Sequence, residues 1–136
     1  MTGPFVVDAS VSLAWCFDDE ASDESEALLD RLGASGGLVP VIWEYETANV
    51  LAIAERRARI TEAEASRRSR LLYGLPIHIV RDLDPGALLH AARRHDLTAY
   101  DAAYLVLAER EGVPLATRDR ALASAAEAAG VEILPA

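Results

Sequence analysis

The chain has 136 residues, of which 51% are hydrophobic and 26% charged, so we expect one globular domain, residues 1–136, and exclude a disordered chain. Acidic residues outnumber basic ones by 22 to 13, and the net charge of −9 excludes a nucleic-acid binder with a uniformly basic surface. Cys16 is the only cysteine, which excludes a disulfide scaffold. With neither a basic leader nor an apolar run near the roughly 18 residues of a membrane span, we expect a cytoplasmic protein that does not contact membranes.

Short apolar runs alternate with amphipathic helical segments along the first half of the chain. Residues 33–37 are predicted to end a helix and form a turn. The pattern predicts, in order, a strand at 4–8, a helix capped by Ser10 that ends near Phe17, a helix from about 22 to 32, a strand at 38–39 and a helix at 42–59.

The second half continues the alternation and sets the fold class. It predicts a helix opened by the capping box Thr61–Glu64 and ending near Tyr73, a strand at 77–80, helices opened by Asp84-Pro85 and by Thr98, a strand at 113–116, a helix at 119–129 and a strand at 131–134. Strands that alternate with helices indicate an α/β protein whose parallel sheet is covered on both faces. In such folds ligands bind beyond the carboxyl ends of the strands.

Four carboxylates fall where that edge of the sheet is expected. Asp8 ends the first strand, Glu46 and Asp101 lie in the first turns of helices, and Asp119 follows a late strand by two residues. Helix-end preferences offer a separate explanation for three of them: a dipole contact for Glu46, a capping box with Thr98 for Asp101 and an N-cap for Asp119. Asp8 fits such an explanation less well, because Ser10 is the better cap and a buried carboxylate needs a partner.

Together, these acids indicate a divalent cation. Carboxylates that share one cleft repel each other, and a hard cation such as Mg²⁺ removes that penalty while keeping water and phosphate oxygens as further ligands. The three histidines, His78, His90 and His95, are too scattered for a zinc site. A metal at this edge favours phosphoryl chemistry, and the lack of a glycine-rich phosphate loop disfavours a nucleotide-cofactor or kinase-like protein.

Four segments, in order and over essentially the whole chain, resemble the motifs of PIN-domain ribonucleases, and more narrowly those of VapC-type toxins from toxin–antitoxin pairs. They are Val6-Val7-Asp8-Ala9-Ser10-Val11, Trp43-x-Tyr45-Glu46-x-Ala48-Asn49-Val50-Leu51, Leu97-Thr98-Ala99-Tyr100-Asp101-Ala102-Ala103-Tyr104 and Leu115-Ala116-Thr117-Arg118-Asp119-Arg120.

The resemblance implies a three-layer α/β/α sandwich with a central parallel sheet, Mg²⁺ or Mn²⁺ dependence, and hydrolysis of RNA to 5′-phosphate and 3′-hydroxyl ends. It also implies a homodimer and inhibition by a small cognate antitoxin. Asp8, Glu46, Asp101 and Asp119 match the metal-binding and catalytic acids, with Asp8 and Asp101 as the principal ligands and Asp119 the outermost. The small polar residues that match supporting positions are Ser10, Asn49 and Thr117.

An acidic ribonuclease needs local positive charge to guide RNA. Six of the thirteen arginines lie between residues 56 and 70, and Arg56, Arg57 and Arg59 are the candidate RNA contacts. A solvated helix face or an antitoxin interface would explain the same cluster. The tryptophans and the tyrosines of the motifs are predicted to be core or dimer contacts rather than base-stacking platforms.

Three other functions share parts of this pattern. A phospho-acceptor receiver domain needs a lysine, and the chain has none. A haloacid-dehalogenase-like phosphatase needs D-x-D after the first strand, where this chain has Asp8-Ala9-Ser10. A catalytically inactive PIN-like domain that binds RNA or a protein partner stays open, although all four acids are present.

Overall fold

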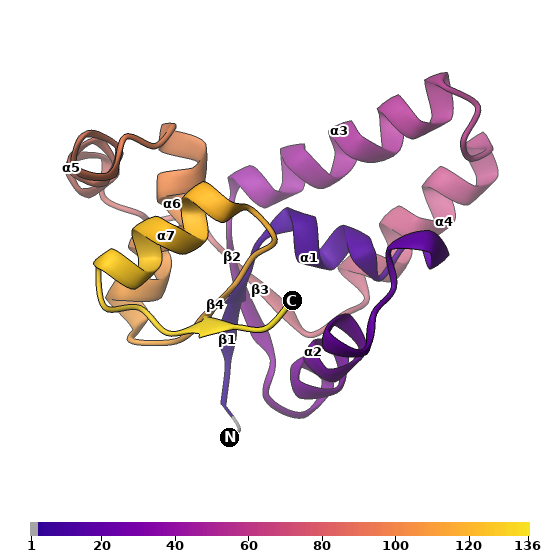
Figure 1. The fold of residues 1–136 in the computed structure, drawn as a ribbon. Coiled ribbons are helices and arrows are strands. Elements are labelled where there is room, and N and C mark those ends of the chain that lie inside the picture. Colours follow the sequence, from indigo (N-terminus) through magenta and orange to yellow (C-terminus); the bar gives the residue numbers. More distant parts are fainter. Residues whose placement is uncertain (1–2) are drawn as a thin grey trace.

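A five-stranded sheet forms the centre of the protein. The structure, a computed structural model, describes residues 3–136, so the first two residues of the expected domain lie outside the described part (Figure 1). The strands run in the order β3-β2-β1-β4-β5 and all pairs are parallel, which confirms the predicted sheet. Their bounds are β1 Phe5–Val7, β2 Gly37–Pro40, β3 Ile77–Val80, β4 Leu115–Ala116 and β5 Ile133–Leu134.

Helices cover both faces, so the α/β/α sandwich is confirmed. Figure 1 shows α5, α6 and α7 on one side of the sheet and α1 to α4 on the other, as right-handed crossovers require when the chain reverses direction after β3. Their bounds are α1 Ala9–Ala14, the short 3-10 helix η1 Asp18–Glu20, α2 Asp23–Ser35, α3 Ile42–Arg56, α4 Glu62–Tyr73, α5 Pro85–His95, α6 Ala99–Glu111 and α7 Arg120–Ala128. Within the described residues no helix is both long and apolar enough to cross a bilayer.

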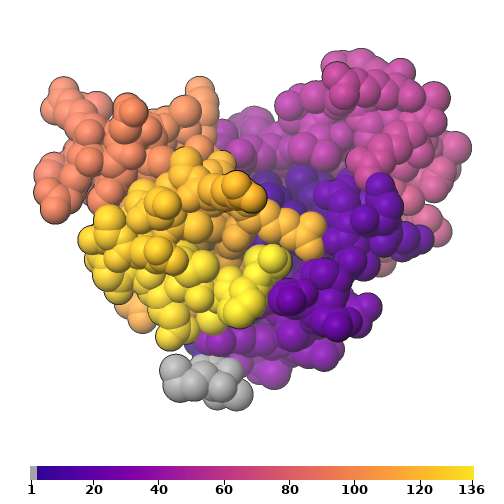
Figure 2. Space-filling model, in the orientation of Figure 1, coloured from indigo at the N-terminus to yellow at the C-terminus, as the bar shows by residue number. Residues whose placement is uncertain are grey.

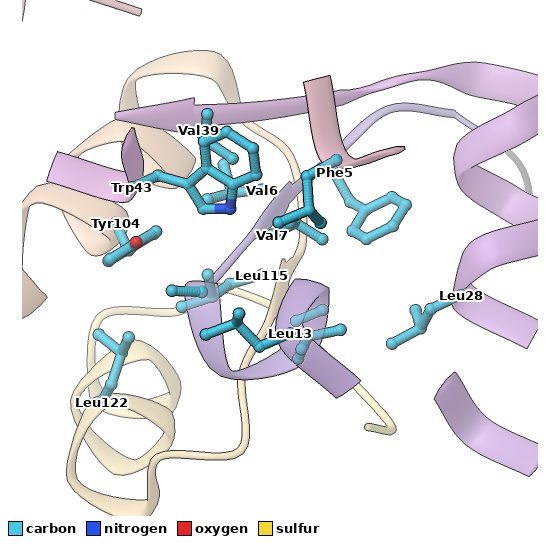
Figure 3. Packing of buried hydrophobic residues seen from close by; sticks show 14 of the residues in the cluster. Phe5, Val6, Val7, Leu13, Leu28, Val39, Trp43, Tyr104, Leu115 and Leu122 are labelled. Atoms are coloured by element: carbon cyan, nitrogen blue, oxygen red, sulfur yellow. The ribbon is translucent and has the colours of Figure 1, made fainter. Parts of the chain in front are cut away.

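The core lies where the first strand meets α3 and α6. All three residues of β1 are fully buried, and so are Trp43 of α3 and Tyr104 of α6 (Figure 3). In register, Val6 lies between Leu38 of β2 and Leu115 of β4. This packing fixes the carboxyl end of β1 and the first turns of α3 and α6 relative to one another.

The start of α1 differs from the prediction. Ser10 is not the N-cap; the helix begins at Ala9, and Asp8 occupies the cap position without a side-chain cap hydrogen bond. The Asp8 carbonyl accepts the amides of Val11 and Ser12, so the helix begins two residues earlier than expected. Ser10 therefore lies inside the helix, where its hydroxyl is free to bond elsewhere.

Several other ends also differ. Helix α3 ends at Arg56 rather than residue 59, because Ala58 takes a positive φ of 57° and the Arg59 amide turns back to the Ala54 carbonyl. Helix α2 continues through Gly33 to Ser35 and ends where Gly36 takes a φ of 79°. α1 stops at Ala14, short of the expected end near Phe17, and the last two strands are two residues long each, both shorter than predicted.

Candidate functional site

The four predicted acids lie at the carboxyl edge of the sheet. Asp8 directly follows β1, Asp119 lies between β4 and α7, Glu46 lies early in α3 and Asp101 in the first turn of α6. Burial is the main cause that raises the pKa values of Glu46 and Asp101. The charges of Asp8 and Asp101 add to it at Glu46, and those of Asp119 and Asp8 add to it at Asp101. In the space-filling view the surface is hollowed between α7 and the α3–α4 pair (Figure 2).

Asp8 is the most buried of these acids, with 5% of its surface exposed. Its Oδ2 atom accepts two hydrogen bonds, from the Thr117 hydroxyl at 2.6 Å and from the Ser10 hydroxyl at 3.1 Å. Burial raises the pKa of Asp8, and it outweighs the hydroxyl bonds, which lower it. Ser10 and Thr117, predicted as supporting residues, are thus joined directly to the buried carboxylate.

The loop between β4 and α7 is bonded to α1 on one side and to the α1–α2 connection on the other. The Arg118 amide donates to the Ser10 hydroxyl at 3.1 Å, and the Arg118 guanidinium donates to the Glu20 carbonyl at 3.0 Å. Asp119 is the N-cap of α7, as the structural explanation of this acid foresaw, because its Oδ1 accepts the Leu122 amide at 3.0 Å. One oxygen of Asp119 is therefore committed to the helix.

Glu46 has a partner that the sequence did not suggest. The Tyr104 hydroxyl donates to Glu46 Oε1 at 2.6 Å, linking α6 to α3. Burial, followed by the charges of Asp8 and Asp101, raises the pKa of Glu46 despite this bond, which lowers it. Tyr104 was expected to be a core or dimer contact; its ring is in the core, but its polar end belongs to the acidic edge. The available signal was its position one helical turn after Asp101.

Asp101 takes part in the N-terminal cap of α6 through its amide and in the acidic edge through its carboxyl. The Thr98 hydroxyl accepts the Asp101 amide at 3.1 Å, so Thr98 caps α6 as predicted. Burial raises the pKa of the Asp101 carboxyl, and the charges of Asp119 and Asp8 raise it further. The carboxylate is thus held in a partly desolvated position close to other negative charge.

The remaining candidates make no hydrogen bond or ion pair to these four acids within the described residues. Asn49 is exposed on α3, and no hydrogen bond joins it to the four acids within the described part of the chain. Arg56 and Arg57 are exposed at the far end of α3. Arg59 is already engaged: its guanidinium bonds Asp19 at 2.9 Å and Glu20 at 3.1 Å, and lies over the Phe17 ring.

Across residues 3–136, no three His, Cys, Asp or Glu side chains converge tightly enough to hold a metal ion directly. The donor set nevertheless suits Mg²⁺, which is typically bound through one or two carboxylates and keeps several of its waters. The raised pKa values of Asp8, Glu46 and Asp101 show that their negative charges are costly without a cation. The chemistry of the residues therefore fits a cation bound partly through water.

Replacing Thr117 by valine is expected to destabilise the protein by about 1 to 3 kcal/mol. Valine keeps the shape of the side chain, but buried Asp8 loses its shortest hydrogen bond and the Asp119 amide loses the hydroxyl that accepts it. Thr47→Val is the matched control: Thr47 is equally buried, but its hydroxyl bonds only helix carbonyls. Urea unfolding of both variants measures the difference. A loss for Thr117→Val no greater than that for Thr47→Val would contradict the role given to the hydrogen bonds of the Thr117 hydroxyl.

The chain is similar in sequence to a protein family and in fold to solved structures. The sequence model of the PIN domain family matches residues 5–128. Ribonuclease VapC3 of Pyrobaculum aerophilum is 35% identical over 122 residues, which cover 87% of this chain and 91% of that protein. The crystal structure of PAE2754 from the same organism matches with a TM-score of 0.73 and 26% identity, over 96% of this chain and 83% of that one. The structure of FitAcB from Neisseria gonorrhoeae matches with a TM-score of 0.68 over 96% of each chain; at 17% identity, this likeness concerns the fold alone.

Proposed function

Since the chain belongs to the PIN-domain family, we propose that it is a metal-dependent endoribonuclease of the VapC type, the toxin of a toxin–antitoxin pair. The observation that carries the proposal is the gathering of all four motif acids at one edge of the sheet, in a chain that is 35% identical to a VapC ribonuclease over most of its length. The reaction is hydrolysis of an RNA phosphodiester bond to a 5′-phosphate and a 3′-hydroxyl.

Asp8 and Asp101 would hold the divalent cation, directly or through water, with Mg²⁺ the expected ion and Mn²⁺ a substitute. When bound, the cation would activate the attacking water and neutralise charge that develops on the phosphate. Glu46 would complete the acidic pocket as a further ligand of the cation, directly or through water, and would help to accept the proton of the attacking water. Asp119 has one oxygen left for orienting water or for a second ion. Ser10 and Thr117 keep the Asp8 carboxylate in place.

Purified protein incubated with total RNA and Mg²⁺ is expected to give discrete fragments, and ligation-dependent sequencing of their 5′-phosphate ends would identify the target. Folded protein that binds Mn²⁺ but leaves every RNA intact would contradict the ribonuclease. That outcome would instead favour a PIN-like domain that binds RNA or a protein partner without cutting.

Arg56 and Arg57 are the proposed guides for RNA, because both guanidiniums are exposed and neither is in an ion pair within the described residues. The double variant Arg56→Ala/Arg57→Ala is expected to raise KM about threefold to tenfold at low salt, to weaken the salt dependence of binding, and to leave kcat unchanged. Arg93→Ala/Arg94→Ala removes the same charge from α5 and is the control. Equal effects in both variants would contradict a local RNA contact.

The proposed partners are a small cognate antitoxin and a second copy of the chain. Apolar side chains remain exposed on several helices, including Leu71 of α4 and Tyr100 of α6, and such surface is available for protein contacts. Co-expression with the product of a neighbouring small gene, followed by co-purification and light scattering, tests both partners. A monomer at high concentration, or failure of the two proteins to associate, would contradict the respective proposal.

A further inference from the structure

The hydrogen bond between Tyr104 and Glu46 is not used by the mechanism above. We propose that Tyr104 is a positioning residue, whose hydroxyl holds the Glu46 carboxylate at the acidic edge in the orientation that the reaction needs. The inference rests on the proposed function, because it assigns Tyr104 a role in the same site. The two residues are 58 positions apart in sequence, and the bond between Tyr104 Oη and Glu46 Oε1 is 2.6 Å long.

Tyr104 is a rigid donor. Its side chain is completely buried, and every residue of α6 from Ala102 to Ala108 is buried around it. Figure 3 shows the ring among the buried core residues near Trp43 and Leu115, and the hydroxyl bonds Glu46. A buried hydroxyl needs a partner, and among the described residues Glu46 is the acceptor that Tyr104 reaches. Because the core fixes the ring, the position of the donating oxygen is fixed as well.

Glu46, by contrast, would not stay in place by itself. It is only half-buried, on the surface side of α3, and the negative charges of Asp8 and Asp101 repel it. Without an attractive contact, a flexible glutamate in this position would turn toward water, where its charge is better solvated. The Tyr104 bond opposes that movement. It engages Oε1 alone, and Oε2 accepts no hydrogen bond from the residues described, so that oxygen is available to solvent, cation or attacking water.

The pair therefore resembles a metal ligand, Glu46, and an outer group, Tyr104, that orients it by a hydrogen bond. Such partners orient acidic groups at metal sites, and their removal typically lowers metal affinity or activity by about tenfold to a hundredfold. A merely structural tyrosine would instead affect stability and leave the site intact when only its hydroxyl is removed. The two roles predict different results for the same substitution.

Tyr104→Phe removes the hydroxyl and keeps the ring. We expect kcat for RNA cleavage to fall about tenfold or more while KM for RNA stays within about twofold, and the Kd for Mn²⁺, measured by calorimetry without RNA, to rise several-fold. Tyr73→Phe is the matched control, since Tyr73 is half-exposed on α4 with its ring against Trp43, away from the acids. In a Glu46→Ala background, Tyr104→Phe should cause no further loss of Mn²⁺ affinity, because its partner is gone.

Wild-type kcat and wild-type Mn²⁺ affinity in Tyr104→Phe would overturn the inference while leaving the ribonuclease intact. An equal further loss in the Glu46→Ala background would also overturn it, because Tyr104 would then act independently of Glu46. If the wild type cuts no RNA, the proposed function fails; the calorimetric comparison still decides whether Tyr104 positions Glu46. Thermal melting of each variant separates these outcomes from a loss of folding.

Discussion

Asp8→Asn is expected to abolish RNA cleavage, by at least about a thousandfold, and at the same time to make the metal-free protein more stable. Asp8 is buried at the end of β1, and burial raises the pKa of its carboxyl. At neutral pH the folded protein therefore holds a charge that is costlier there than in the unfolded chain. Asparagine keeps the size of the side chain and an oxygen for Ser10 and Thr117, but it removes that charge and the principal metal ligand.

Melting in EDTA at pH 7.5 measures the stabilisation, which at about 1 kcal/mol corresponds to an increase in Tm of roughly 3 to 6 °C. Asp30→Asn, an exposed substitution on α2, controls for the change in net charge and should leave both Tm and cleavage near the wild-type values. Cleavage that survives Asp8→Asn would show that the reaction does not depend on this carboxylate. A variant that is inactive and also less stable would mean that the charge itself holds the folded loop together.

The parts of the fold that follow from local sequence were predictable. Continuous apolar runs such as Phe5–Val7 and Ile77–Val80 mark strands that are covered on both faces, and their alternation with helices implies parallel pairing. The same alternation placed Asp8 and Asp119 at one edge, because the carboxyl ends of parallel strands meet there. These inferences need only the order of elements along the chain.

What the sequence did not predict depends on contacts between distant segments. Capping preferences favoured Ser10 as a helix cap, but its hydroxyl bonds Asp8 and accepts the amide of Arg118, 108 residues away. Likewise, Arg59 belongs to an arginine-rich segment that suggested RNA contact, but its guanidinium forms ion pairs with Asp19 and Glu20 of η1. Tyr104 lies in an apolar stretch of α6, but its hydroxyl donates to Glu46 of α3. Local propensity is a weak guide wherever a side chain's partner comes from another element.

Removing divalent cations with EDTA is expected to stop cleavage, by about a thousandfold or more, and excess Mg²⁺ should restore it. The structural reason is the mutual repulsion of the four carboxylates, since burial and neighbouring charge raise the pKa values of Asp8, Glu46 and Asp101. A cation that neutralises them would bind the folded protein in preference to the unfolded chain. Stability should therefore rise with free Mg²⁺, by about 2.7 kcal/mol at a hundred times its Kd.

The same groups set the pH dependence of the metal-free protein. Because their pKa values are raised on folding, the folded state retains protons that the unfolded chain loses above about pH 4. Their contribution to stability is thus greatest at low pH and is lost as the pH rises through the folded pKa values. Mg²⁺ competes with these protons, so its stabilising effect should be larger at pH 7.5 than at pH 5.

Melting temperatures at both pH values, with EDTA and with Mg²⁺, test this linkage. Subtracting the results for Asp8→Asn/Asp101→Asn cancels the contribution of histidines and surface ion pairs, which both proteins share. The remaining difference should show that a rise in pH lowers the stability of the metal-free wild type and that Mg²⁺ restores it. A difference with the opposite sign, or a Mg²⁺ effect that is the same in the double variant, would place the cation away from these acids, because only groups that lose a proton on binding can couple the two equilibria.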